Sequence, residues 1–114
     1  MPPPFRIAVV ESDDLMRQLL LRWLDDAGYR ATEAKAAGLA GQSFDLVLAD
    51  VAGPRSVAML VRSVRTAHAG PLILLSARFG RGSGATLGLQ GVSAALAKPL
   101  ARDELLQAVR AALP

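Results

Sequence analysis

The stretch that most constrains the fold is Phe44–Asp50, a short apolar run that ends on a carboxylate. Residues 46–49 are all apolar, without alternation, which is typical of a strand buried on both faces in the middle of a parallel sheet. Asp50 follows at the carboxyl end of that strand. In open α/β sheets the functional crevice lies beyond those strand ends. Asp50 is therefore the first candidate functional residue.

The composition is that of one globular domain. The chain has 114 residues, of which 52% are hydrophobic and 4% aromatic, so one core built from Leu, Val and Ala is expected. The absence of cysteine excludes a disulfide framework and thiolate metal sites. No apolar run reaches the roughly 18 residues of a membrane span. We expect a cytoplasmic domain over residues 5–113, after a disordered leader at residues 1–4.

The charge gives little support to nucleic-acid binding. The formal net charge is +3, and basic domains are candidates for such binding. The arginines are nevertheless scattered, with no basic run and no aromatic residues interleaved for stacking on bases. We expect neither nucleic acid nor membrane as a partner of this domain.

Strand and helix segments alternate along the whole chain. Strands are expected at residues 6–10, 29–33, 46–50, 72–76 and 94–97. Helices are expected after residues 12–14 up to Gly28, at 57–64 and at 103–113, with a short one at 34–43 and a glycine-rich one at 78–91. This alternation predicts an α/β fold, with a parallel sheet between helices on both faces.

Polar side chains follow four of the expected strands and would converge at one edge of the sheet. They are Glu11, Ser12 and Asp13 after the first strand, Asp50 after the third, Ser76 after the fourth and Lys98 after the fifth. Clustered carboxylates favour a hard cation such as Mg²⁺. An aspartate beside such a cation can attack phosphorus, while a lysine and a hydroxyl stabilise the phosphoryl oxygens. Asp50 fits the nucleophile, Lys98 the counter-ion and Ser76 the hydroxyl.

With these pieces in order, the chain resembles the receiver domain of bacterial two-component response regulators of the chemotaxis-regulator type. The resemblance covers residues 5–113 and is carried by Val9–Asp13 with Arg17, Phe44–Asp50 with Pro54, Leu74–Ala77, Gly91, and Lys98–Pro99. It implies a doubly wound, flavodoxin-like sheet of five parallel strands in the order 2-1-3-4-5. It also implies that Asp50 accepts a phosphoryl group from a histidine kinase or phosphotransfer protein. The implied Mg²⁺ ligands are Glu11, Asp50, the weakened position Ser12 and the backbone carbonyl of Ala52.

Two departures from the family pattern bear on function. Ser12 stands where the family usually has a second acidic residue, and a hydroxyl is a weaker ligand than a carboxylate, so weak Mg²⁺ binding is expected. Ala95 stands where the family usually has an aromatic switch residue. The usual coupling of a hydroxyl shift to an aromatic flip therefore cannot operate, and the face formed by the fourth helix, fifth strand and fifth helix is expected to be pre-shifted or mobile.

Two functions remain open from the sequence. The first is a phosphorylatable receiver that switches protein contacts through that face, either to an output domain, to a partner protein or within a homodimer. It would be at most a Mg²⁺-dependent self-phosphorylating and autodephosphorylating protein and not a conventional enzyme. The alternative is a pseudo-receiver, acting as a phosphorylation-independent interaction module.

Several other polar and aromatic residues have structural interpretations. Asp13 and Asp14 are expected to cap a helix rather than bind metal, and Trp23 to pack against the core. His68 is expected to be solvent-exposed at a helix end, and Arg62 and Arg65 to form a solvated face.

Overall fold

The structure, a computed structural model, describes residues 4–35, 39, 43–50, 56–66, 68–76, 92–97 and 100–113. Its elements in chain order are β1 (Arg6–Val10), α1 (Asp14–Asp26), β2 (Arg30–Glu33), β3 (Leu46–Asp50), α2 (Ser56–Arg65), β4 (Leu72–Ser76), β5 (Ala94–Ala97) and α3 (Arg102–Ala112). The five strands form one sheet in the order β2-β1-β3-β4-β5, and every pairing is parallel. The predicted fold class and strand order are confirmed.

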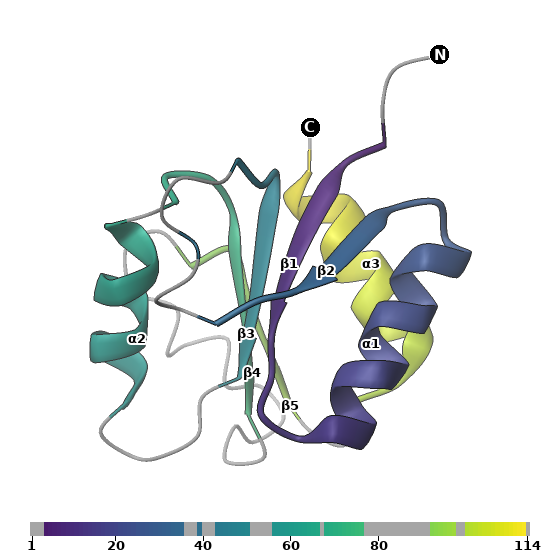
Figure 1. Ribbon diagram of the computed structural model, residues 1–114, viewed down its shortest axis with the longest axis horizontal. Helices are drawn as coiled ribbons and strands as arrows, with labels where there is room; N and C mark the ends of the chain where they lie inside the picture. The colour runs from purple at the N-terminus through teal and green to yellow at the C-terminus, as the bar shows by residue number, and fades with distance from the viewer. Residues whose placement is uncertain are drawn as a thin grey trace.

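Helices cover both faces of the sheet, with α1 and α3 on one side and α2 on the other (Figure 1). The buried strands β1, β3 and β4 supply both cores by alternation, because successive side chains point to opposite faces. One core joins Ile7, Val9, Leu46, Leu48, Ile73 and Leu75 to α1 and α3. The other joins Ala8, Val47, Ala49, Leu72 and Leu74 to Val64 of α2 and to Leu39.

The ends of α1 follow from its local sequence. The carboxylate of Asp13 accepts hydrogen bonds from the backbone N–H groups of Leu15 and Met16, so the predicted helix cap is confirmed for Asp13, while Asp14 is the first residue of the helix. After the helix, Gly28 has a φ of +94°, a backbone conformation that favours glycine. Trp23 packs against the core as expected. Leu15, in the first turn of the helix, is a large apolar side chain that is 69% exposed.

The turn between α2 and β4 corrects two expectations about charged side chains. His68 is buried, and its Nε2 donates a hydrogen bond to the carbonyl oxygen of Pro71 at 2.8 Å. Arg65 is half-buried and donates through Nη1 to the carbonyl oxygens of His68 and Gly70. Both side chains therefore stabilise the segment between α2 and β4 through hydrogen bonds to its backbone. Of the two arginines expected on a solvated face, only Arg62 is exposed.

Several expectations lie outside the described residues. They include the glycine-rich helix at 78–91, most of the short helix at 34–43, and residues 1–3 of the leader. Within the part of the chain that is described, no helix is long and apolar enough to cross a membrane.

Candidate functional site

The register of the sheet places the predicted site residues at one edge. Val10 pairs with Ala49, so the next residue on each strand, Glu11 and Asp50, lies at the same level. Asp50 in turn pairs with Leu75, the residue before Ser76. The carboxyl ends of β1, β3 and β4 therefore carry these polar groups together, as the sequence predicted.

The site residues differ in their exposure to solvent. Ser76 and Glu11 are buried, with 1% and 7% of their surface exposed. Asp50 is half-buried and Ser12 is exposed. The Glu11 carboxylate accepts a hydrogen bond of 3.3 Å from the backbone N–H of Asp13. Ser76 and Glu11 are thus covered by the protein, while Asp50 and Ser12 remain in contact with solvent.

A pocket of about 660 Å³ opens beside Asp50. Its polar lining residues are Glu11, Ser12, Arg17, Glu33, Lys35 and Asp50. Three of the predicted residues, Glu11, Ser12 and Asp50, thus share one pocket. A volume of this size is in the range of small-ligand sites and leaves room for a phosphoryl group.

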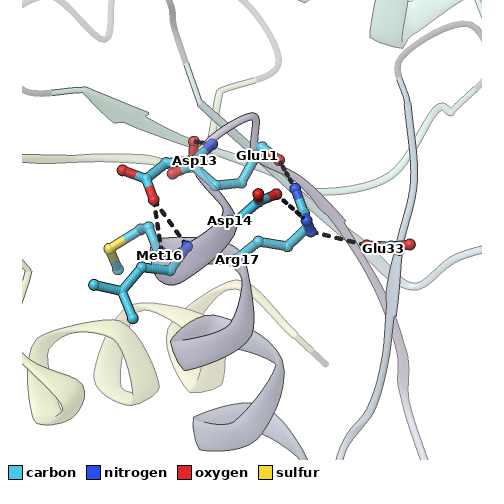
Figure 2. Close-up of polar contacts among 7 residues, drawn as sticks. Glu11, Asp13, Asp14, Met16, Arg17 and Glu33 are labelled. Carbon is cyan, nitrogen blue, oxygen red and sulfur yellow. Dashed lines mark hydrogen bonds and ion pairs between the residues drawn. The ribbon is translucent and has the colours of Figure 1, made fainter.

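Arg17 is fixed at the wall of this pocket by three contacts (Figure 2). Its Nη1 donates to the carbonyl oxygen of Glu11 at 3.1 Å, and its Nε lies 2.8 Å from a carboxylate oxygen of Glu33. Its Nη2 pairs with the carboxylate of Asp14. The hydrogen bond that Arg17 donates to Asp14, aided by the negative charges of Asp14, Glu33 and Glu11, raises the pKa of Arg17 against a smaller opposing effect of burial. Arg17 is therefore a permanent cation that links the start of α1 to the ends of β1 and β2.

Sequence reasoning missed Glu33 and Lys35 as lining residues. They stand at the end of β2 and just after it, where the ladder pairs Val9 with Glu33 and so brings this edge strand beside the β1 end. The signal was available in principle, because the strand order 2-1-3 makes β2 a neighbour of β1. The Ala- and Gly-rich composition of residues 34–43 indicates a short helix and gives no sign of a site.

Two predicted site residues, Lys98 and Ala52, lie outside the described residues. Ala97, the residue before Lys98, is described and pairs with Ser76. The proposed roles of Lys98 and of the Ala52 carbonyl remain predictions.

The donors at the site fit Mg²⁺ in kind, since they are carboxylate and hydroxyl oxygens in one pocket. Within the described ranges no three His, Cys, Asp or Glu side chains are grouped so as to hold a metal ion. The pocket thus offers two neighbouring strand-end carboxylates, Glu11 and Asp50, with the hydroxyl of Ser12. The expected weak Mg²⁺ binding stays a prediction.

Comparisons with known proteins agree with this architecture, although no family model matches the chain. The chain is 33% identical over 117 residues to Protein PetR of Rhodobacter capsulatus, and the match covers 96% of the chain but spans only about half of PetR, 49%. Among solved structures, a response regulator protein from Burkholderia multivorans is 28% identical, with a TM-score of 0.69 and coverage of 94% of this chain and 93% of that one.

A CheY-like response regulator receiver domain protein from Methanospirillum hungatei is 19% identical, with a TM-score of 0.76, over 94% of this chain and 91% of its own. The parallel five-stranded sheet in the order 2-1-3-4-5 agrees with both solved structures. The chain therefore has the fold of the CheY-like receiver domains of response regulators.

Proposed function

We propose that the chain is a response-regulator receiver domain, spanning residues 5–113, that accepts a phosphoryl group on Asp50. The observation that carries this proposal is the position of Asp50. It stands half-buried at the carboxyl end of the central strand β3 and opens into the same pocket as Glu11 and Ser12. A carboxylate held at such a point is accessible to a donor but shielded from bulk water.

The proposed reaction transfers a phosphoryl group from a histidine nitrogen of the donor to a carboxylate oxygen of Asp50. A carboxylate oxygen of Asp50 attacks the phosphorus of a phosphohistidine, the P–O bond forms as the P–N bond breaks, and the imidazole nitrogen leaves with the bonding electron pair and takes up a proton. The hydroxyl of Ser76 and the ammonium of Lys98 would hold the transferred oxygens. Glu11, Asp50, Ser12 and the Ala52 carbonyl would hold Mg²⁺, whose charge would offset that of the phosphoryl group.

The partners follow from this function. A histidine kinase or phosphotransfer protein would supply the phosphoryl group in the cytoplasm. An output domain, a partner protein or a second copy of the chain would read the change through the face that includes β5 and the last helix. Phosphorylation would act there by shifting a population between two states.

The pseudo-receiver is the second candidate, and two observations favour it. Ser12 is an exposed residue that lines the pocket, at a position where a carboxylate would bind metal more strongly. Ala95 is half-buried against the core shared with α2, and a methyl group has no rotamer with which to signal. On this alternative the domain binds its partner equally well with Asp50 or with asparagine at that position.

Intact-mass measurement separates the two candidates. The protein is incubated with phosphoramidate and high Mg²⁺, alongside Asp50→Asn and Asp45→Asn. Asp45 is a matched control because it lies just before the other end of β3, where its carboxylate accepts from the backbone N–H of Arg6 at 2.7 Å. We expect an adduct of about 80 Da in the wild type and in Asp45→Asn, and none in Asp50→Asn. No adduct in the wild type at high Mg²⁺ would overturn the first proposal.

A further inference from the structure

The charged lining of the pocket goes beyond the residues expected from the sequence. We propose that Arg17 and Lys35 are built-in cations that weaken Mg²⁺ binding in the Asp50 pocket. This rests on the proposed function in that it takes Mg²⁺ to be the ion that the pocket binds. The domain would then be loaded with metal only at high Mg²⁺, whatever the supply of phosphoryl donor.

The first argument is the position of Arg17. Its guanidinium is bonded at once to the carbonyl oxygen of Glu11 and to the carboxylates of Asp14 and Glu33. Glu11 is the residue directly before Ser12, where the family places its metal-binding acid. These three contacts place the guanidinium and its charge at the pocket wall (Figure 2).

The second argument is the charge of the pocket. Its lining holds three carboxylates, Glu11, Glu33 and Asp50, and two cations, Arg17 and Lys35. The formal charge of this lining is therefore only −1, and the Glu33 carboxylate, like that of Asp14 outside the lining, is already paired with Arg17. Hard divalent ions need a surplus of oxygen-borne negative charge, and this pocket offers little of it.

The third argument weighs a purely structural role for the Arg17 contacts. The side chains of Glu33 and Asp14 are 64% and 82% exposed, and ion pairs so exposed add little to stability. The main consequence of the network is thus to hold a permanent cation in place. At separations of about 8 Å in a water-like medium, one such charge weakens the binding of a divalent ion by roughly three- to tenfold.

The experiment measures the Mg²⁺ affinity of the full chain by isothermal titration calorimetry at low ionic strength, with no phosphoryl donor present. The variants are Arg17→Gln, Lys35→Gln and the double variant. Arg22→Gln is the matched control, since Arg22 is an exposed arginine of the same helix and does not line the pocket. We expect Kd to fall by about three- to tenfold in each single variant, further in the double variant, and by less than about twofold in Arg22→Gln.

Arg17→Lys separates charge from shape, because it keeps the cation and loses the forked contacts. We expect its Kd to stay close to that of the wild type. Equal or weaker Mg²⁺ binding in both Arg17→Gln and Lys35→Gln would overturn the proposal, as would a gain in Arg17→Lys as large as that in Arg17→Gln. If Arg17→Gln does not fold, the exposed Lys35→Gln decides the outcome. Because no phosphoryl transfer is involved, the result is independent of whether Asp50 is phosphorylated.

Discussion

Val10 of β1 pairs with Ala49 of β3 in the parallel ladder, so Glu11 and Asp50 leave the sheet at the same level. This pairing brings two carboxylates that are far apart in the sequence to the same edge of the sheet, which we call the acidic edge. It also fixes which residue next to Glu11 reaches the pocket: the lining includes Ser12, while Asp13 caps α1. Ser12 is therefore part of the candidate metal site.

Restoring a carboxylate at position 12 should strengthen the metal site. We expect Ser12→Asp to lower the Mg²⁺ concentration that half-saturates adduct formation with phosphoramidate by about tenfold, because a charged ligand replaces a neutral one. Ser63→Asp, on the exposed surface of α2, introduces the same charge elsewhere and should change little. An unchanged half-saturation in Ser12→Asp would contradict the placement of this residue at the metal site.

Truncation at the centre of β3 should destabilise the fold strongly. Leu48 is fully buried between the sheet and the helices α1 and α3, so Leu48→Ala should lower the free energy of unfolding by about 2–5 kcal/mol. Leu15→Ala provides the matched control, since Leu15 is 69% exposed and should cost less than about 0.5 kcal/mol. Urea denaturation followed by circular dichroism measures both values, and similar losses would show that β3 is not the centre of the core.

The fold was predictable because the local patterns all pointed the same way. The unbroken apolar run before Asp50 indicated a central parallel strand, and Gly28 marked the end of the first helix. The polar edge of the sheet was predictable for the same reason, since Asp50 and Ser76 directly end their strands. These features depend on short-range sequence and on the general geometry of parallel sheets.

Features that depend on tertiary contacts escaped sequence reasoning. The buried His68 donates a hydrogen bond to the carbonyl oxygen of Pro71, and no hydrophobic periodicity in the sequence predicts such a contact. The Arg17 network needs β2 to lie beside α1, so Glu33 was not recognised as its partner. Lys35 was likewise missed, because an exposed lysine after an edge strand looks like any solvated charge.

The turn before β4 should not tolerate a side chain at position 70. A Cβ added at Gly70 would lie 2.9 Å from Cε1 of His68, whose ring is buried and hydrogen-bonded to Pro71. We expect Gly70→Ala to lower the free energy of unfolding by about 1–3 kcal/mol. The loss should largely vanish when Gly70→Ala is made in a His68→Ala background. A full loss in both backgrounds would show that the ring is not the obstacle.

The start of α1 should depend on Asp13. Its carboxylate accepts from two backbone N–H groups of the first turn, so Asp13→Ala should cost about 1 kcal/mol of unfolding free energy. Asp26→Ala, at the last residue of the same helix, removes a charge that the helix dipole disfavours. Thermal denaturation should therefore show a lower Tm for Asp13→Ala and an equal or higher Tm for Asp26→Ala. The reverse order would contradict the cap.

The central claim is that Asp50, and no other carboxylate, receives the phosphoryl group. It is tested most directly by treating the protein with phosphoramidate and Mg²⁺, reducing it with borohydride and mapping its peptides by mass spectrometry. Reduction converts an aspartyl phosphate to homoserine, so the modified residue is read from the fragment ions. We predict homoserine at position 50 and at no other aspartate. Homoserine at Asp13 or Asp45 instead, or none anywhere at saturating donor and Mg²⁺, would contradict the account.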